Sequence, residues 1–242
     1  MTQLQVGRAG RVSVLTLARP DHGNRLSHRM AEQLTAALEA ARRDPEIGAC
    51  VITGHGGVFC LGGDYKGAGP TSAGRAEFGR ASVDLYRAMA TLGKPLVAAV
   101  NGDAHAGGFS LVAAADLAIV ADDATLGLPE AANGLFPFLA LAVVRDALPK
   151  KLLFDIIYNA RLIGAREACE LHVVNKSVPR ADVLDEAIRI ATTASRYNSD
   201  IVMLGRDLYY SMRGVGPTEA IDKSRFALMA ALAAKDQQIK PT

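Results

Sequence analysis

The segment Asn101–Leu111 reads NGDAHAGGFSL, and it follows a run of small apolar residues, Pro95–Val100, that is typical of a buried strand. Gly107 and Gly108 stand where a helix should begin, so the pattern predicts a strand, a tight turn and a helix in succession. The first N–H groups of a helix have no partner within it and lie at the positive end of its dipole. The turn therefore suits an anion or a developing oxyanion, although a plain strand-to-helix corner has the same pattern.

A second glycine turn of the same kind lies earlier in the chain. The apolar run Cys50–Thr53 predicts a short buried strand, and it leads to the segment Phe59–Asp64, which reads FCLGGD. Its adjacent glycines, Gly62 and Gly63, permit backbone dihedrals that other residues avoid, and they let a ligand approach the main chain closely. A free N–H in this turn is thus a second candidate for oxyanion binding. Taken alone, the glycine pair favours a tight turn in which Asp64 caps nearby amides.

Strand-like and helix-like patterns alternate through the first 150 residues. Gln3–Val6 and Val12–Leu17 are expected to pair as a hairpin. Ser27 is expected to cap a helix that ends before Pro45. Further elements are expected as a helix over 77–91, a helix over 107–115 and a strand over 117–120. Strand, glycine turn and helix thus occur twice, which indicates a repeating ββα organisation.

Two segments differ from this pattern. Residues 65–76 are polar and rich in glycine, which predicts a mobile loop. After residue 149 the chain becomes mainly helical, and such a helical tail must pack on its own core or on a neighbouring subunit. We expect a core over residues 1–190 and a C-terminal helical region over 191–242. The helices expected in this part are Ala165–Leu171, Asp182–Arg196 and Thr218–Ala234.

The composition argues against several classes of protein. The 27 basic and 25 acidic residues give a net charge of +2 with no basic stripe, so nucleic acid is not an expected partner. Asp116 interrupts the best apolar stretch, so no membrane span is expected, and the first residues lack the features of a secretory signal. The three cysteines have no C-x-x-C spacing, which favours a reduced cytoplasmic protein without a disulfide framework or a metal site.

Glu130 is a third candidate for chemistry. It follows a strand-like run and Pro129, and it precedes the apolar segment 131–138. A carboxylate in an apolar pocket has a raised pKa and can act as a general base. A lone glutamate is more often a solvated surface residue, so the assignment depends on the order and spacing of all three features.

That order and spacing resemble the enoyl-CoA hydratase/isomerase family, also called the crotonase superfamily. The resemblance covers roughly residues 3 to 235. It implies an α/β fold with a spiral core of repeated ββα units and a C-terminal helical region that forms a homotrimer or a dimer of trimers. It also implies an acyl-CoA substrate and no cofactor apart from the coenzyme A of that substrate. The pieces that match are Arg19-Pro20, Asn24, Leu26-Ser27, Val51–Gly54, Phe59-Cys60, Gly62, Asp64, Lys94–Gly102, Gly107-Gly108, Asp116, Gly127, Pro129-Glu130, Gly134-Leu135, Pro137, Ala165, Glu167-Ala168, Val173–Asn175 and Val178.

The resemblance assigns roles to individual residues. The N–H groups of Gly63 and Gly107 are expected to form the oxyanion hole for the thioester carbonyl. Glu130 falls on one of the two glutamates that hydratases of the family use, whereas the other position holds Ser110. Phe138-Leu139-Ala140 stands where the family often has glycines, which predicts a bulkier and drier site. The residues expected to bind coenzyme A and the acyl group are Arg25, Leu26, Gly62, Asp64, Tyr65, Lys66, Gly108 and Phe138.

Several other side chains have two interpretations. His105 lies in the second turn and titrates in the right range for a catalytic role, but a packed histidine behind the turn is more usual. Cys60 has no evident histidine partner, which favours a buried thiol over a nucleophile. Tyr209, Tyr210 and Phe226 are expected either to line the acyl pocket or to belong to the core.

A single glutamate with an oxyanion hole favours a proton shuttle over hydration, which two carboxylates perform well. We therefore expect Glu130 to move a proton from carbon 2 to carbon 4 of a 3-enoyl-CoA and so form a 2-enoyl-CoA, a reaction of fatty acid metabolism. Hydration is the alternative if Ser110 holds a water molecule, and thioester hydrolysis or decarboxylation is possible on the same scaffold. An alternative of another class is a coenzyme A-binding subunit with little or no catalysis.

Overall fold

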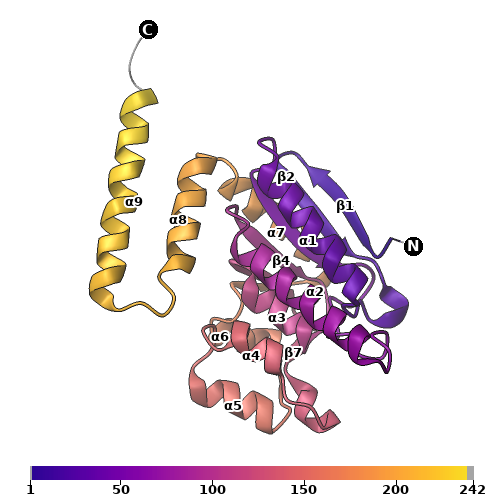
Figure 1. Ribbon diagram of the computed structural model, residues 1–242. Coiled ribbons are helices and arrows are strands. Elements are labelled where there is room, and N and C mark those ends of the chain that lie inside the picture. Colours follow the sequence, from indigo (N-terminus) through magenta and orange to yellow (C-terminus); the bar gives the residue numbers. More distant parts are fainter. Residues whose placement is uncertain (1, 239–242) are drawn as a thin grey trace.

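A six-stranded sheet forms the centre of the computed structural model, which describes residues 2–238 (Figure 1). The strands lie in the order β1-β2-β3-β4-β6-β9. β1 and β2 pair antiparallel, which confirms the predicted hairpin, and the later neighbours pair in parallel. The strands of this sheet are β1 (Leu4–Ala9), β2 (Val12–Leu17), β3 (Ala49–Gly54), β4 (Leu96–Val100), β6 (Leu117–Ala121) and β9 (Lys176–Val178).

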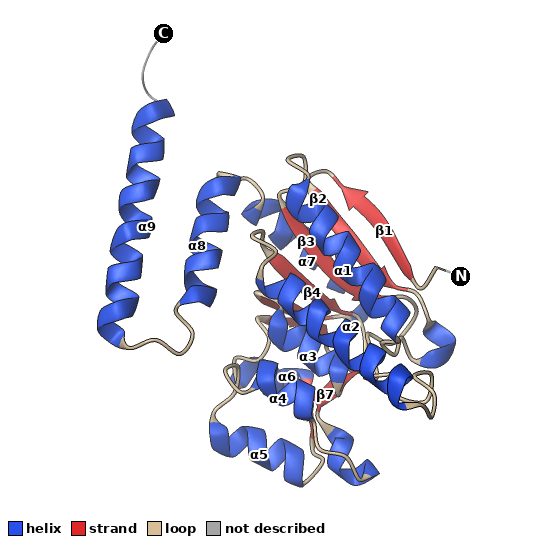
Figure 2. Ribbon diagram, in the orientation of Figure 1, coloured by secondary structure: helices blue, strands red, loops and turns tan. Residues whose placement is uncertain are grey.

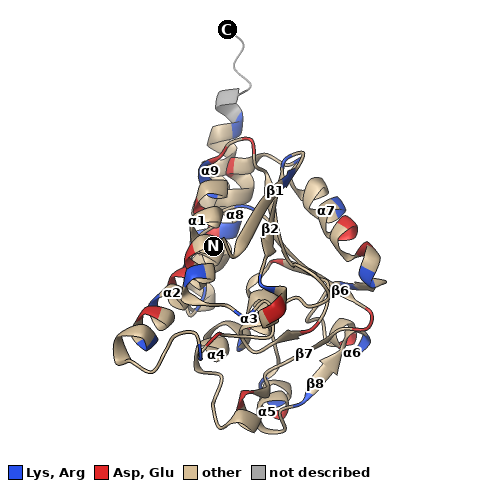
Figure 3. Cartoon of the chain, turned by 90° about the vertical axis from the view of Figure 1, so that its right-hand side faces the viewer, with Lys and Arg blue, Asp and Glu red and all other residues tan. Residues whose placement is uncertain are grey.

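The central strands are apolar along their whole length because both faces of the sheet are covered. Every residue of β3 and of β4 is buried. Parallel strands between two helical layers have this continuous apolar pattern instead of an alternating one. α7 (Val183–Ala194) lies against β3 and β4 on one face, and α1 (His28–Arg43) with α2 (Ser72–Ala90) covers the other (Figures 2 and 3).

A smaller sheet completes each repeat of the core. It contains β5 (Ala104–His105), β7 (Thr125–Gly127) and β8 (Leu162–Gly164) in the order β5-β7-β8. A bridge between Cys60 and Ala104 adds the first glycine turn to this layer. The chain therefore passes from the large sheet to the small sheet and then into a helix after β3, after β4 and after β6, which confirms the predicted ββα repeat.

The start of α1 shows how sequence sets the ends of the helices. Ser27 Oγ accepts a hydrogen bond of 3.1 Å from the N–H of Met30, as expected of an N-cap. Met30, Leu34 and Leu38 are buried on one face of the helix, because residues four apart lie above one another. The remaining helices are α3 (Gly107–Ala114), α4 (Phe138–Val144), α5 (Lys150–Tyr158), α6 (Ala165–Glu170), α8 (Ser199–Ser211) and α9 (Pro217–Gln238), with short 3-10 turns at η1 (Pro20–His22), η2 (Pro129–Asn133) and η3 (Arg180–Asp182).

The loop predicted over residues 65–76 is shorter than expected. α2 begins at Ser72, because the Thr71 side chain accepts a hydrogen bond of 3.1 Å from the N–H of Gly74 and caps the first turn. This cap outweighs the low helix propensity of Gly74. The segment without regular structure is therefore residues 65–71.

In the helical region after α7, α9 stands apart from the core, whereas α8 is attached to it (Figure 1). Arg206 holds α8 to the core: its guanidinium donates to the Asp116 carboxylate at 3.0 Å and to two main-chain carbonyls at the end of α2. The predicted boundary at residue 190 falls inside α7, which lies on the large sheet. Within the residues that the structure describes, no helix combines the length and the apolar character needed to cross a bilayer.

Tyr209 and Phe226 have neither of the two positions predicted for the aromatic residues of this region. Tyr209 is 59% exposed and Phe226 is 65% exposed, so neither belongs to the core. Neither residue lines a cavity near the glycine turns. Tyr210 lies against the guanidinium of Arg206 instead, where the cation contacts the ring face.

Candidate active site

The two glycine turns lie against each other. A methyl group built on Gly107 would lie 3.5 Å from the Gly63 nitrogen, so the gap between the two main chains is only about one methyl group wide. Gly62 has a φ of 107°, and a methyl group there would lie only 2.7 Å from the side chain of Ala106. A residue with a side chain at position 62 would therefore be strained and would separate the turns.

The pairing around Gly63 leaves its N–H group free. Leu26 and Gly63 form a parallel bridge, in which Leu26 N–H donates to the Gly62 carbonyl and Asp64 N–H donates to the Leu26 carbonyl. This arrangement uses the groups on either side of the Gly63 N–H. Gly107 is the first residue of α3, where a helix has no internal acceptor for an N–H group. Both N–H groups are thus available to a ligand.

Ala106 sets the orientation of the Gly107 N–H group. It has a φ of 53° and precedes the first residue of α3. Residues other than glycine rarely adopt a positive φ, and such strain gathers at functional sites. The turn from β5 into α3 is therefore held in an unfavourable backbone conformation at the point that presents the Gly107 N–H. The sequence offered no signal for this strain, because alanine does not mark it.

Two adjoining cavities contain these residues. The outer cavity has a volume of about 500 Å³, and it is lined by Arg25, Leu61, Gly63, Asp64, Tyr65, Lys66, His105, Ala106, Pro129, Glu130, Asn133 and Leu135. The inner cavity has a volume of about 30 Å³, and it is lined by Leu26, Gly63, Tyr65, Phe78, Ser82, Tyr86, Gly107, Ser110, Glu130, Pro137, Leu139 and Ala140. Gly63, Tyr65 and Glu130 belong to both. A ligand that spans the two cavities would therefore pass between the glycine turns and Glu130.

Glu130 is buried without a counter-charge. It lies in η2 and is 7% exposed, and its Oε2 atom has no hydrogen-bond partner in the described structure. Burial raises the pKa of this carboxyl above its usual range, because the charged form loses its hydration. A buried group of this kind is poised to hold a proton and to release it. Asp64 is the other acidic residue that lines the cavities.

Asp64 has a different environment. Its Oδ2 atom accepts a hydrogen bond of 2.9 Å from Arg19, and its Oδ1 atom accepts one of 2.9 Å from the N–H of Gly67. Partial burial alone would raise the pKa of Asp64, but these hydrogen bonds lower it below its usual value. Asp64 therefore stays ionised and fixes the loop after the first turn.

Ser110, Gly108 and Cys60 support the second turn from behind. Ser110 is fully buried, and its hydroxyl donates to the Ala106 carbonyl at 3.2 Å. Gly108 lines neither cavity, and a methyl group there would overlap the Cys60 carbonyl, so glycine is required for packing. Burial raises the pKa of Cys60 to about 11, which keeps it a thiol at neutral pH.

His105 is held neutral at the edge of the outer cavity. Its Nε2 atom lies 2.9 Å from Thr125 Oγ1, and the Thr125 hydroxyl itself donates to Asp103 at 2.8 Å. The threonine oxygen thus accepts the histidine proton, which assigns that proton to Nε2. Burial lowers the pKa of His105. Arg25 and Lys66 line the same cavity, and the Arg25 guanidinium donates to the Leu61 carbonyl.

Phe138 lines neither cavity, contrary to its assignment as a residue that binds the acyl group. It is 76% exposed, and its ring packs against Phe136 at a centroid distance of 5.5 Å. Phe138 is the first residue of α4, and the helix directs the next two residues, Leu139 and Ala140, into the inner cavity instead. The inner cavity is small because Leu139 enters it and because the rings of Tyr65 and Phe78, tilted against each other at a centroid distance of 5.1 Å, form part of its wall.

Sequence reasoning missed one wall of the inner cavity. Phe78, Ser82 and Tyr86 come from α2, and they recur at four-residue spacing on one face of the helix. That spacing is visible in the sequence, but an amphipathic face by itself indicates only a packed helix. The position of α2 over α3 is what turns this face toward the glycine turns.

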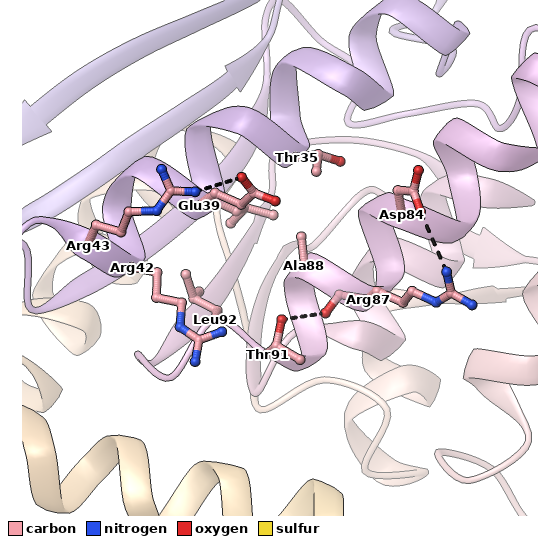
Figure 4. Close-up of a pocket in the computed structure, with 10 residues that line it drawn as sticks. Thr35, Glu39, Arg42, Arg43, Asp84, Arg87, Ala88, Thr91 and Leu92 are labelled. Atoms are coloured by element: carbon pink, nitrogen blue, oxygen red, sulfur yellow. Dashed lines mark hydrogen bonds and ion pairs between the residues drawn. The ribbon is translucent and has the colours of Figure 1, made fainter.

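A separate hollow lies between α1 and α2, away from the glycine turns (Figure 4). It has a volume of about 530 Å³, but its charged side chains are exposed and largely paired with each other. Arg43 lies 2.9 Å from Glu39, and Arg87 lies 3.6 Å from Asp84. Exposed pairs of this kind contribute little binding energy, so we place the candidate site at the outer and inner cavities.

The model of the family described as enoyl-CoA hydratase/isomerase matches residues 7–218 of this chain. A putative enoyl-CoA hydratase from Thermus thermophilus is 35% identical over 211 residues, which cover 86% of this chain and 83% of the relative. A carnitinyl-CoA dehydratase from Escherichia coli is 35% identical over 191 residues, which cover 78% of this chain and 72% of the relative.

Comparison with solved structures identifies the same family. The crystal structure of an enoyl-CoA hydratase from Mycobacterium smegmatis matches with a TM-score of 0.90 at 25% identity, and the alignment covers 100% of this chain and 99% of that one. The repeated ββα core with its helical C-terminal region is thus a crotonase fold. Since the family model spans both glycine turns and Glu130, the chain belongs to the enoyl-CoA hydratase/isomerase family.

Proposed function

We propose that this acyl-CoA enzyme shifts a double bond, converting a 3-enoyl-CoA into a 2-enoyl-CoA. The observation that carries the proposal is Glu130, a buried carboxylate whose Oε2 atom has no partner and which lines both cavities. Asp64 is already held by Arg19. One free carboxylate suits a proton shuttle, whereas hydration in this family uses two.

The first step of the proposed reaction breaks a C–H bond. Glu130 takes the proton from carbon 2, and the electron pair of that bond moves toward the thioester carbonyl. The resulting dienolate carries its negative charge on the thioester oxygen, which accepts hydrogen bonds from the Gly63 and Gly107 N–H groups. Donors placed for a developing oxyanion contribute about 3 kcal/mol each to lowering the barrier.

The second step returns the same proton. Glu130, now a neutral acid, protonates carbon 4, and the electrons left behind form the double bond between carbons 2 and 3. The raised pKa of Glu130 supports both halves of this cycle, because an acid and a base of matched strength transfer a proton most efficiently. No water molecule and no second carboxylate is consumed.

Hydration of a 2-enoyl-CoA is the second candidate, because the relatives are named enoyl-CoA hydratase and carnitinyl-CoA dehydratase. Under that alternative, Ser110 would help to place the attacking water. The test compares two rates of the purified protein: isomerisation of a 3-enoyl-CoA and hydration of a 2-enoyl-CoA. Isomerisation should be the faster reaction, and faster hydration would overturn the proposal.

A coenzyme A-binding subunit without catalysis is separated by the same experiment. Saturable binding of an enoyl-CoA with neither reaction above the rate of the Glu130→Gln variant would favour that reading. We further propose that the active form is a trimer or a dimer of trimers. The support is the set of large apolar side chains that α9 exposes, namely Ile221, Phe226, Leu228, Met229 and Leu232.

A further inference from the structure

Each oxyanion N–H group shares a peptide unit with a carbonyl group. The Gly63 N–H belongs to the peptide that carries the Gly62 carbonyl, and the Gly107 N–H belongs to the peptide that carries the Ala106 carbonyl. A trans peptide is planar, so its N–H and its C=O point in opposite directions. Whatever holds the carbonyl oxygen therefore fixes the direction in which the N–H group points.

Both carbonyl groups accept two hydrogen bonds, one from the main chain and one from a side chain. The Gly62 carbonyl accepts from the Leu26 N–H at 2.8 Å and from the Cys60 thiol at 3.7 Å. The Ala106 carbonyl accepts from the Ser110 N–H at 3.1 Å and from the Ser110 hydroxyl at 3.2 Å. A carbonyl oxygen has two lone pairs, so both oxygens are saturated. The same arrangement thus occurs at each half of the oxyanion hole.

The two side-chain donors act on the peptide units and not on a ligand. Cys60 and Ser110 are both fully buried, so water does not compete for these bonds. Cys60 lines neither cavity. Ser110 lines the inner cavity, but its proton is directed to the Ala106 carbonyl.

A hydrogen bond at the carbonyl of a peptide strengthens the donor at its other end. When the oxygen accepts a proton donor, electron density moves toward it and the N–H group becomes more polar. This cooperative strengthening amounts to about 10–30% per bond. It matters most in the transition state, where the thioester oxygen carries the developing charge.

The second turn also needs support for its geometry. Ala106 has a φ of 53°, and relaxation of this strained residue would rotate the peptide that it shares with Gly107. The two bonds from Ser110 hold the Ala106 oxygen against that rotation.

We propose that Cys60 and Ser110 are positioning residues of the proposed reaction: each holds the carbonyl of one oxyanion peptide and so orients and polarises its N–H group. Ser110 should have the larger effect, because an S–H group is the weaker donor. The inference rests on the proposed acyl-CoA site, but it does not depend on what the enolate becomes. It gives Ser110 a task that needs no water molecule, in contrast to the hydration alternative.

The carbonyl stretching frequency of a bound thioester measures how strongly the two N–H groups polarise it. We would bind butanoyl-CoA, labelled with carbon-13 at the thioester carbonyl, and record infrared difference spectra against the unlabelled compound. This thioester has no double bond to shift, so the readout is independent of turnover. In the unmodified protein the frequency should lie below that of free butanoyl-CoA. Ser110→Ala and Cys60→Ala should each return it part of the way to the free value.

Conservative variants separate the hydrogen bond from the filling of space. Ser110→Thr keeps a hydroxyl and should keep the low frequency, and Cys60→Ser replaces a weak donor by a stronger one and should lower the frequency further. Thr35→Val is the control. It removes a hydroxyl that donates to the carbonyl four residues earlier, Ala31, at 2.8 Å, but it lies in α1 at the hollow away from the glycine turns (Figure 4). It should leave the frequency unchanged.

Turnover of a 3-enoyl-CoA gives a second measure. A whole oxyanion donor is worth about 10²–10³-fold in kcat, and a supporting bond changes its neighbour by about 10–30%, so each alanine variant should lower kcat about two- to eightfold. KM should change little, because binding of the ground state depends mainly on the outer cavity.

The outcomes distinguish this inference from the proposed site. A bound thioester whose frequency is unchanged in both alanine variants would overturn the positioning role and leave the acyl-CoA site intact. A frequency that rises in Cys60→Ser would overturn it as well, because the hydrogen bond would then not be the cause. If the carbonyl bound to the unmodified protein has the frequency of the free thioester, the oxyanion hole itself is wrong and the inference falls with it.

Discussion

Replacing Glu130 by glutamine tests the chemistry and the energetics of the site together. The side chain is 7% exposed, and glutamine has nearly the same shape but does not take a proton at neutral pH. Loss of a positioned general base typically slows a reaction about 10²–10⁴-fold. We expect that loss in the isomerisation of a 3-enoyl-CoA. Thioester binding should persist, because it depends on the Gly63 and Gly107 N–H groups and on the outer cavity.

The same change should stabilise the fold at neutral pH. Burial raises the pKa of Glu130 in the folded state, so the unfolded chain ionises this carboxyl more readily. Below the ordinary glutamate pKa of about 4.3, both states are protonated and the group costs nothing. As the pH rises through that value, ionisation favours the unfolded state, and the loss of stability is complete above the raised pKa of the folded state.

The size of this penalty follows from the missing hydrogen bonds. A buried polar group without a partner costs about 1–3 kcal/mol, and more when it is charged. Glutamine removes the charge but leaves its amide poorly paired, so we expect a net gain of about 1 kcal/mol. For a chain of this length, that gain raises Tm by about 2–4 °C.

Urea unfolding of both proteins at pH 8 and pH 4 is the assay. The gain in the free energy of unfolding should be present at pH 8 and should disappear at pH 4. A glutamine variant that is less stable than its parent at pH 8 would show that the carboxylate has a favourable partner in solution. Turnover close to that of the parent would remove Glu130 from the mechanism.

Three further predictions concern the oxyanion turn, the loop and the assembly. Gly107→Pro deletes one oxyanion donor and should reduce turnover about 10²–10³-fold. Gly107→Ala keeps the N–H group, and its methyl group fits at 3.5 Å from its neighbours, so this variant should retain far more activity. Circular dichroism checks that both variants are folded. Hydrogen exchange of residues 65–71 should slow when a coenzyme A thioester saturates the protein, and unchanged exchange would refute a role of this loop in binding. Sedimentation at micromolar concentration should give a trimer or hexamer, and a monomer would contradict the interface proposed for α9.

The elements of the core that were predicted correctly have local sequence patterns that by themselves specify a helix or a strand. The hairpin, the helix capped by Ser27 and the helix that begins at Gly107 all have an apolar period with a cap or a glycine at the expected place. α4 was missed because its residues, FLALAVV, are apolar on every side and show no helical period. The start of α2 was missed because Gly74 has a low helix propensity, although Thr71 caps the helix three residues earlier.

The parts of the candidate site that the main chain forms could be predicted from the sequence, whereas the parts formed by side chains from different elements could not. The glycines at positions 62, 63 and 107 indicate that two stretches of main chain come close together, and the proline before Glu130 indicates a turn. The strain at Ala106 and the hydroxyl face of α2 depend on how elements meet across the core, so no local pattern reveals them. Phe138 was assigned to the site from its place in the chain, but the direction in which α4 starts turns it to the surface.

The way the repeats meet explains why one scaffold supports several reactions. The bridges from Leu26 to Gly63 and from Cys60 to Ala104 hold the two turns in register, so their unused N–H groups converge. Stabilisation of an enolate thus belongs to the fold, and it survives substitution of the side chains around it. Under the proposed function, what the enolate becomes depends on the groups that deliver protons or water, for which Glu130 and the residue at position 110 are the candidates. In the proposed reaction, a serine at that position stands where a second carboxylate would serve hydration, so the two N–H groups hold the same enolate while the choice of reaction rests on Glu130.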